Sequence, residues 1–254
     1  YDVVPYYRQL FQDQKISRRH LRDSTILNEI PILEKGEVEK HAQKLQTDHL
    51  WPGHKQAGTT QSSGTTGQPT VVQHSDFSLG MFRWLKQREL RWYRYDPLAA
   101  MLSIRPKIEL PRMPDGSLIP DGTYLKLAAW PYLGGLFETG PAWAFNNTNP
   151  VREQVQTLEK IKPNYLLMQS SCLEYLSMQE ISAETVDSLV GVHAISQTLT
   201  PAMREQIEKI FRVPLHQNYG LNEIGLVASR CEEGGRYHVH SEQCLVEIVR
   251  DDGT

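Results

Sequence analysis

Two hydrophobic patterns alternate along most of the chain, one with the period of a helix and one typical of buried strands. Apolar positions recur at helical spacing over 151–161 and 200–211, and a proline marks the start of each segment. Short apolar runs at 99–104, 165–168 and 192–195 predict buried strands. Further predicted helices cover 16–22, 32–45, 76–95, 173–178 and 183–189, and further predicted strands cover 124–129 and 214–218.

The pattern changes near the end of the chain. After Gly225 the predicted strands are shorter and hairpin-like, over 226–229, 236–240 and 245–249. Strand–helix alternation followed by hairpins predicts an α/β fold, with helices flanking the sheet and a more antiparallel part near the C-terminal end. Residues 53–70 are small and polar, and they predict a loop that ends in a β-like stretch.

The composition is that of a globular protein with no strong charge bias. The chain has 254 residues, of which 39% are apolar and 22% charged, with a net charge of −3. These values fit one large domain and give no sign of a nucleic-acid surface, which needs clustered excess Lys and Arg. The densest basic stretch, 83–94, is interleaved with aromatic residues. We interpret it as an amphipathic helix with a solvated basic face rather than as a binding surface for single strands.

The cysteines indicate the redox environment of the protein, and the two chain ends indicate whether the domain is complete. Three cysteines are too few for a disulfide framework and fit a reducing cytoplasm. No run approaches the roughly 20 apolar residues that a membrane-spanning helix needs. The chain begins at Tyr1 in a sequence typical of a domain interior, and it ends with an Asp-Gly turn signal directly after a predicted strand. We therefore expect a domain that is truncated at both ends.

A loop rich in glycine and hydroxyl side chains carries the strongest functional signal. It reads Ser62-Ser63-Gly64-Thr65-Thr66-Gly67-Gln68-Pro69-Thr70. Glycines let the backbone approach a ligand closely, and successive N–H groups with nearby hydroxyls are suited to phosphate oxygens. It lacks the lysine of the G-x-x-x-x-G-K-[ST] loop. The alternative is a flexible surface loop of low complexity.

A second candidate constellation follows the helix at 200–211. Tyr219-Gly220-Leu221-Asn222-Glu223 comes directly after a predicted strand. A carboxylate in such a turn is well placed to hold Mg²⁺ together with phosphate oxygens, and an aromatic ring beside glycine can stack on a base. Taken alone, the stretch is better explained as a strand-to-turn corner with a solvated glutamate.

The two motifs, in this order, resemble those of adenylate-forming enzymes. In that superfamily the loop reads Ser/Thr-Ser-Gly-Ser/Thr-Thr-Gly-x-Pro, and Thr70 in the next place is similar to the phenylacetate–coenzyme A ligase branch. The resemblance implies that the loop residues Ser62 to Gly67 hold ATP phosphates. It further implies that Tyr219 stacks on adenine, that Gly220 and Asn222 belong to the cofactor site, that Glu223 binds Mg²⁺, and that Glu223, Thr65 and Thr66 serve catalysis. Asn222 replaces the usual hydroxyl residue.

The same resemblance suggests an acyl pocket. Trp130 to Phe137 is an aromatic and glycine-rich stretch similar to one that lines the acyl site of aryl-acid ligases, which makes Tyr132 and Phe137 candidate wall residues; core packing is an equal alternative. Ser196 lies where the family has a Gly/Ala-rich run with Glu, and we count it as a candidate substrate contact.

Cys231 and His238, with His240 and Cys244 nearby, raise the question of zinc. Some relatives in the branch resemble the Cys-x₆-His spacing and complete a site with a Cys-x-Cys pair, which here would lie beyond Thr254. We favour no metal in this chain, then a half-site formed by Cys231 and His238, and last a site of all four residues.

The resemblance implies a two-step reaction for an N-terminal AMP-binding domain over 1–254, without the small mobile C-terminal domain. A carboxylic acid, aryl or arylacetic by resemblance, attacks ATP to give acyl-AMP, and a thiol of coenzyme A or a carrier protein takes the acyl group. A homodimer is compatible with this interpretation. The competing hypothesis is a nucleotide- or acyl-binding module without catalysis, favoured by Asn222 and by the changed segment around Ser196.

Overall fold

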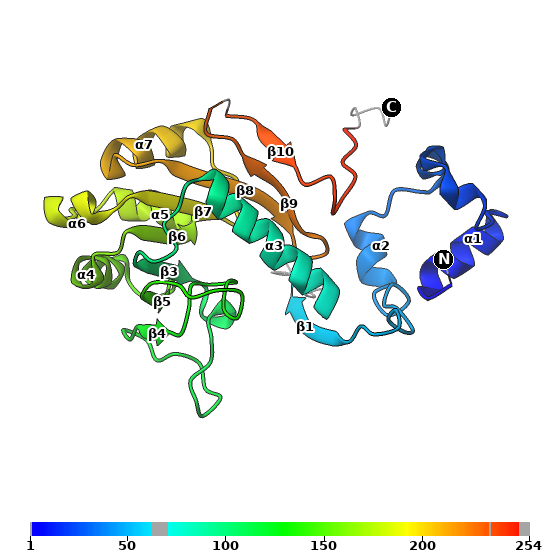
Figure 1. The fold of residues 1–254 in the computed structure, drawn as a ribbon, viewed down its shortest axis with the longest axis horizontal. Coiled ribbons are helices and arrows are strands. Elements are labelled where there is room, and N and C mark those ends of the chain that lie inside the picture. The colour runs from blue at the N-terminus through cyan, green and yellow to red at the C-terminus, as the bar shows by residue number, and fades with distance from the viewer. Residues whose placement is uncertain (1, 62–70, 234, 249–254) are drawn as a thin grey trace. The chain divides into compact units, whose positions relative to one another are not determined.

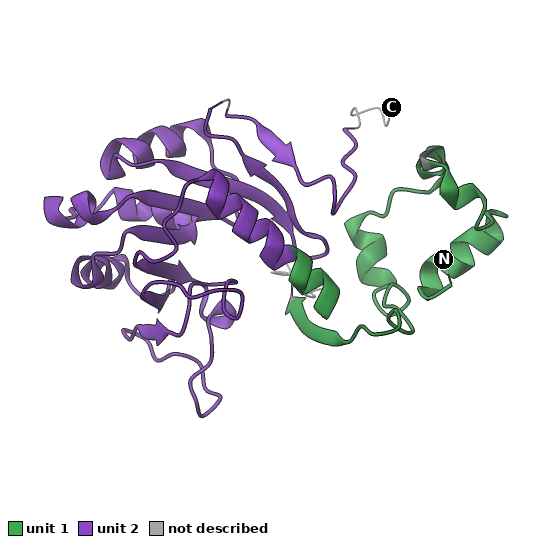
Figure 2. Cartoon of the chain, in the orientation of Figure 1, with its two compact units in different colours: residues 1–81 green, residues 82–254 purple. Residues whose placement is uncertain are grey.

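The computed structural model describes residues 2–61, 71–233 and 235–248. They fall into two compact units, residues 1–81 and 82–254 (Figure 2). The boundary lies inside helix α3 (Asp76–Trp92). No helix in the described ranges combines the length and apolar character needed to cross a membrane.

The first unit contains short helices and a two-stranded sheet (Figure 1). Phe11, Ile16 and Ile26 form its small buried core. Its elements are α1 (Pro5–Asp13), the 3₁₀ helices η1 (His20–Arg22) and η2 (Ser24–Glu29), α2 (Lys35–Lys40), and the antiparallel strands β1 (Gln56–Gln61) and β2 (Val71–Ser75).

The predictions from local sequence patterns were wrong for parts of this unit. The predicted loop over 53–70 contains strand β1, which the sequence did not reveal because its side chains are small and polar. Helix α1 was not predicted, and the predicted helix over 32–45 is helical only from Lys35 to Lys40. The predicted phosphate loop, Ser62 to Thr70, lies outside the described residues; β1 and β2 flank it.

The second unit is built on an eight-stranded sheet with the order β10-β9-β8-β7-β6-β3-β5-β4 (Figure 1). The five strands β3, β5, β6, β7 and β8 run parallel, and β4, β9 and β10 pair antiparallel with their neighbours. This confirms the predicted α/β sheet with a more antiparallel C-terminal part. The strands are β3 (Met101–Arg105), β4 (Leu125–Leu127), β5 (Ala142–Asn146), β6 (Tyr165–Gln169), β7 (Gly191–Ile195), β8 (Leu215–Leu221), β9 (Gly225–Arg230) and β10 (Tyr237–Val239).

The two faces of the sheet bury different side chains, since neighbouring residues of a strand point to opposite faces. On one face Leu102, Leu166 and Val192 pack into the main core together with side chains of α4, α5 and α7. On the other face Met101, Tyr165 and Leu167 pack with Tyr93, just beyond α3, and Trp130. The helices of this unit after α3 are η3 (Lys107–Glu109), α4 (Val151–Ile161), α5 (Ser170–Ser177), α6 (Ala183–Ser188) and α7 (Pro201–Phe211).

Helix α7 shows why some boundaries follow from sequence. Thr200 is its N-cap, and the Thr200 hydroxyl accepts a hydrogen bond from the backbone N–H of Met203 at 3.2 Å. Pro201 occupies the first turn, where its missing N–H costs nothing. Arg212 closes the helix in the left-handed conformation. The predicted helix over 200–211 is therefore confirmed to within a residue.

Three strand predictions need correction. Strand β5 was missed, although it pairs with both β3 and β4. Strand β8 does not end at Tyr219-Gly220 but continues to Leu221, and it stays paired with β9 across an irregularity between Tyr219 and Gly220. The described residues of the predicted strand 245–249 are not a strand: Leu245 and Ile248 are exposed, and 245–248 pair with no strand in the part of the chain that is described.

Gly140, just before β5, leads to a first prediction. A Cβ atom at Gly140 would lie 2.0 Å from the carbonyl oxygen of Leu98 and 2.3 Å from that of Ala99. Because both obstacles are backbone atoms, we expect Gly140→Ala to lower the free energy of unfolding by about 1–3 kcal/mol. Chemical denaturation measures this, with Gly36→Ala as control, since a Cβ there meets nothing within 4 Å. Equal stability of the two variants would contradict the prediction.

Candidate functional site

The second motif lies at the carboxyl edge of the parallel strands, where ligands commonly bind in open α/β sheets. Ser196 follows the last residue of β7, and Tyr219 lies in the last part of the neighbouring β8. The turn between β8 and β9 carries Asn222 and Glu223, both exposed. Tyr219 is also half exposed, at 52%. The predicted nucleotide contacts from this motif are thus accessible and lie on one edge of the sheet.

Gly220 has a structural reason to be glycine. A Cβ atom there would lie 2.8 Å from the carbonyl oxygen of Gly225 on β9. Such an approach is shorter than real side chains tolerate, so glycine lets β8 and β9 pair through the irregularity. Its predicted role at the nucleotide stays a prediction beside this packing role.

Backbone conformation singles out two of the predicted acyl-site residues. Among the described non-glycine residues, six have positive φ. Four of them lie at helix C-terminal ends, where the left-handed conformation is common: Lys15, Arg94, Lys162 and Arg212. The other two are Tyr132, with φ of 70°, and Ser196, with φ of 66°. Strained residues outside caps cluster at binding and active sites, so both positions stay candidate site residues.

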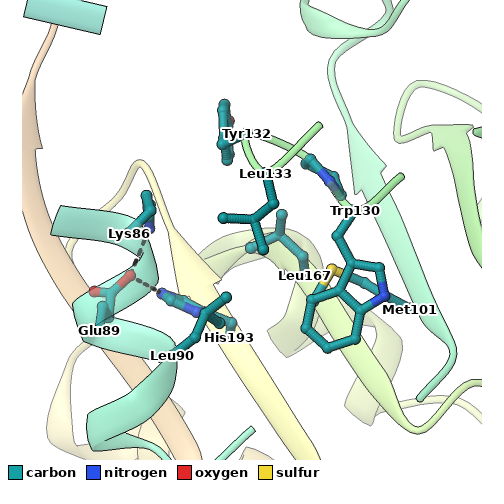
Figure 3. A pocket seen from close by; sticks show the side chains of 10 residues that line it. Lys86, Glu89, Leu90, Met101, Trp130, Tyr132, Leu133, Leu167 and His193 are labelled. Atoms are coloured by element: carbon teal, nitrogen blue, oxygen red, sulfur yellow. Dashed lines mark hydrogen bonds and ion pairs between the residues drawn. The ribbon is translucent and has the colours of Figure 1, made fainter. Parts of the chain in front are cut away.

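A pocket opens beside Tyr132 between α3 and the sheet (Figure 3). Its cavity of about 30 Å³ holds no more than a water molecule or two, so an acid enters only after lining side chains shift. Tyr132 is held by Phe82, whose ring meets it edge-on at 5.2 Å, and by the Arg105 guanidinium, 5.0 Å from the ring centre. The pocket is lined by Lys86, Glu89, Leu90, Met101, Trp130, Pro131, Tyr132, Leu133, Leu167 and His193.

One wall of this pocket carries three buried ionisable side chains, Lys86, Glu89 and His193, which we call the charged wall (Figure 3). The Lys86 ammonium donates to Glu89 Oε2 at 2.7 Å, and the Glu89 side chain is fully buried. Glu89 also accepts hydrogen bonds from the Ser229 hydroxyl at 2.7 Å and from the Asn218 amide at 3.3 Å. Strands β8 and β9 therefore supply the partners that make a buried carboxylate tolerable.

The protonation states of the charged wall follow from these contacts. Burial by itself would raise the pKa of Glu89. The charge of Lys86, the neighbouring His193 and hydrogen bonds from Lys86 and Ser229 together outweigh it and lower the pKa to about 2. Burial lowers the pKa of His193 to about 3 against the opposing effect of Glu89. His193 is thus neutral at pH 7, and its Nε2 accepts a hydrogen bond from Asn218 at 3.0 Å.

The remaining predicted residues have mixed outcomes. Phe137 packs against the cluster that contains Trp130 and Leu133 but does not line the pocket. Cys231 lies just beyond β9, where its N–H bonds the carbonyl of Arg236, and His238 lies on β10 with its ring edge-on to Trp92 at 5.8 Å. In the described part of the chain, no three His, Cys, Asp or Glu side chains are grouped for a metal. The zinc half-site stays a prediction.

The sequence interpretation missed the charged wall. Helix α3 was expected to turn a solvated basic face outward; Arg83 and Arg91 are exposed, but Lys86 is buried. A signal was present in the strand 191–195, where His193 is the one polar residue of an otherwise apolar run. A histidine in the middle of a fully buried strand needs polar partners from a neighbouring element.

Comparisons with known proteins place the fold. No family model matches the chain. A phenylacetate-coenzyme A ligase from Thermus thermophilus is 25% identical over 261 aligned residues, 99% of this chain and 54% of that protein. An open conformation of 2-hydroxyisobutyryl-CoA ligase in complex with 2-HIB-AMP and CoA matches with a TM-score of 0.64 and 14% identity over 92% of this chain and 50% of its own.

A more distant structure gives the same picture. An ATP-bound RpMatB-BxBclM chimera matches with a TM-score of 0.51 and 15% identity, over 70% of this chain and 32% of its own. The chain spans about half the length of the curated relative that it matches. These structural likenesses concern the fold, which agrees with the α/β arrangement described above.

Proposed function

From the fold of the adenylate-forming ligases and the confirmed resemblance to their phenylacetate–coenzyme A ligase branch, we propose that the intact protein activates a carboxylic acid with ATP. The product is an acyl-adenylate, and coenzyme A is the proposed acceptor of the acyl group. The observation that carries this proposal is the pocket beside Tyr132. Its lining includes Trp130 to Leu133, from the stretch that the sequence marked as an acyl site, and Tyr132 and Ser196 share an unusual backbone conformation.

The proposed roles divide between binding and orientation. Ser62, Ser63, Gly64, Thr65, Thr66 and Gly67 hold the ATP phosphates through backbone N–H groups and hydroxyls. Tyr219 offers an exposed ring for adenine, and the Asn222 amide is a hydrogen-bond donor for the α-phosphate. Glu223, an exposed carboxylate, suits Mg²⁺, which neutralises charge on the phosphates when it is bound. Positioning and charge neutralisation supply most of the catalysis expected for such a step.

The substrate class and the domain plan belong to the same proposal. The apolar pocket wall of Trp130, Leu133 and Leu167 suits an aryl or arylacetic acid, the class that the sequence resemblance suggests. Residues 1–254 serve as an AMP-binding domain, and a small mobile domain elsewhere in the intact protein supplies the groups that complete adenylation. A carrier-protein thiol in place of coenzyme A is compatible with the same first step.

Acid-dependent exchange of pyrophosphate into ATP tests the proposal on the intact protein with a panel of aryl and aliphatic acids. We expect Glu223→Ala to lower the exchange rate on the order of 100-fold, because Mg²⁺ loses a protein ligand and the charge on the phosphates is then less well neutralised. Gly64→Asp is expected to abolish it, since a carboxylate would face the phosphates. Glu233→Ala, another exposed turn glutamate, is the matched control and should exchange normally. ATP binding without exchange for any acid would instead indicate a nucleotide-binding module without catalysis.

A further inference from the structure

The pocket beside Tyr132 has two chemically different sides. Trp130, Leu133, Leu167 and Met101 form an apolar side, and the charged wall of Lys86, Glu89 and His193 faces it from α3 and β7 (Figure 3). The indole N–H of Trp130 already donates to the carbonyl of Ala99 at 3.1 Å. The apolar side therefore offers a ligand flat hydrocarbon surface and no polar group from its indole, as suits an aromatic ring.

Lys86 has hydrogen-bonding capacity that the described residues leave unused. Its side chain is 10% exposed, and among the described residues its hydrogen-bond partner is Glu89. An ammonium group carries three N–H donors, so two of them remain. Buried donors without acceptors are costly, and here they line a cavity. The charged wall is thus built to receive a hydrogen-bond acceptor from a ligand.

The charges of the wall indicate which chemical group of a ligand can bind there. Lys86 is positive, Glu89 is ionised and His193 is neutral, so the wall has no net charge. A second carboxylate on the ligand would be attracted by Lys86 but repelled by Glu89. An uncharged group would not suffer this repulsion. The three hydrogen bonds to Glu89 leave room for one more donor on its oxygens. A hydroxyl satisfies both needs, since it accepts from Lys86 and donates to Glu89.

We propose that the charged wall recognises a ring hydroxyl, so that the acid which this protein activates is a hydroxylated aryl or arylacetic acid rather than the unsubstituted one. This inference rests on the proposed function and names the substrate class of the same pocket. Lys86 and Glu89 are then specificity-determining residues. They bind the ring hydroxyl, and other residues orient the carboxylate that reacts with ATP.

The experiment compares acids that differ in one ring substituent, using kcat/KM for ATP–pyrophosphate exchange by the intact protein. Each unsubstituted benzoic or phenylacetic acid is paired with its hydroxy, methoxy and carboxy derivatives at each ring position. We expect kcat/KM for at least one hydroxy acid to exceed that of its unsubstituted parent by about tenfold or more. The parent acid leaves the polar groups of the wall without hydrogen-bond partners. The methoxy and carboxy derivatives should not share this advantage, since one cannot donate to Glu89 and the other is repelled by it.

Variants then assign the preference to the wall. Lys86→Met should lower exchange with the preferred hydroxy acid by roughly 10- to 100-fold and change exchange with the parent only a few-fold. Lys86→Met combined with Glu89→Gln removes both charges, so it tests the same preference without a stranded buried carboxylate. Arg83→Met, an exposed base of the same helix, is the control and should keep the wild-type ratio.

Two results would overturn the inference: a wild-type protein that uses unsubstituted acids as well as hydroxy acids, or a hydroxy preference that survives both Lys86 variants. Absence of exchange with every acid would reject the proposed function instead. In that case calorimetric titration of the same acid pairs decides about the pocket. Tighter binding of the hydroxy acid that Lys86→Met abolishes supports the inference, and equal or absent binding refutes it.

Discussion

Replacement of Glu89 by alanine is expected to lower the free energy of unfolding by about 3–5 kcal/mol, more than Gly140→Ala. The carboxylate is fully buried and holds the Lys86 ammonium at 2.7 Å. Without it, Lys86 keeps a buried positive charge with no counter-ion in the wall. The Ser229 hydroxyl and the Asn218 amide lose an acceptor at the same time. Each of these losses adds to the cost.

Chemical denaturation of matched variants separates this effect from a general loss of a helical glutamate. Glu205→Ala on the exposed side of α7 should change stability by less than about 0.5 kcal/mol. Lys86→Met with Glu89→Gln should recover much of the loss, because a buried ion pair is often replaceable by uncharged side chains when both partners change together. A single Glu89→Ala variant within about 1 kcal/mol of wild type would mean that water, rather than Lys86, compensates the carboxylate.

Elements with strong local signals were predictable from sequence. Helix α4 follows a proline and carries apolar residues at helical spacing, and its bounds agree with the prediction. Strands β6 and β7 are fully apolar or nearly so, as expected of central parallel strands covered on both faces. In each case the pattern within one short segment was enough to predict its conformation.

Elements that depend on a distant partner were not predictable in this way. Strand β5 is held by parallel pairing with β3 and antiparallel pairing with β4, while its own residues include two alanines with weak strand preference. Strand β1 is polar and exists through its pairing with β2. Both depend on contacts between segments that lie far apart or across a long connection, which single-sequence patterns do not contain.

The candidate site divides along the same line. Tyr132 was predicted as a site residue because its neighbours resemble a known acyl site, and in the structure it has a positive φ and lines a pocket. Lys86 and Glu89, three residues apart on a helix, have the spacing of an ordinary surface pair. They are buried because Asn218 and Ser229, well over a hundred residues later, provide the hydrogen bonds that compensate the carboxylate.

The free energy of unfolding should fall steadily as the pH drops below about 6.5, because the buried His193 and Glu89 have lowered pKa values in the folded protein. The pKa of His193 is lowered from its ordinary 6.5 to about 3, so unfolding takes up a proton in this interval and the stabilisation present above pH 6.5 is lost towards pH 3. The pKa of Glu89 is lowered from 4.5 to about 2, so its contribution is present above pH 4.5 and is lost towards pH 2. Burial lowers the pKa values of His216 and His240 as well, in the same destabilising direction on acidification.

The pH dependence can be assigned to a residue by comparing slopes rather than absolute stabilities. Each tenfold loss of proton affinity on folding is worth up to about 1.4 kcal/mol, so the stability should fall by several kcal/mol between pH 7 and pH 4. Denaturation at constant ionic strength across this range measures it. His193→Asn should flatten the slope between pH 6.5 and 4, because no imidazole is left there to take up a proton on unfolding, while the exposed control His49→Asn should leave it unchanged. A slope that His193→Asn does not alter would place the acid sensitivity with His216 and His240 instead, and would mean that His193 is solvated well enough in the folded protein to titrate like a surface histidine.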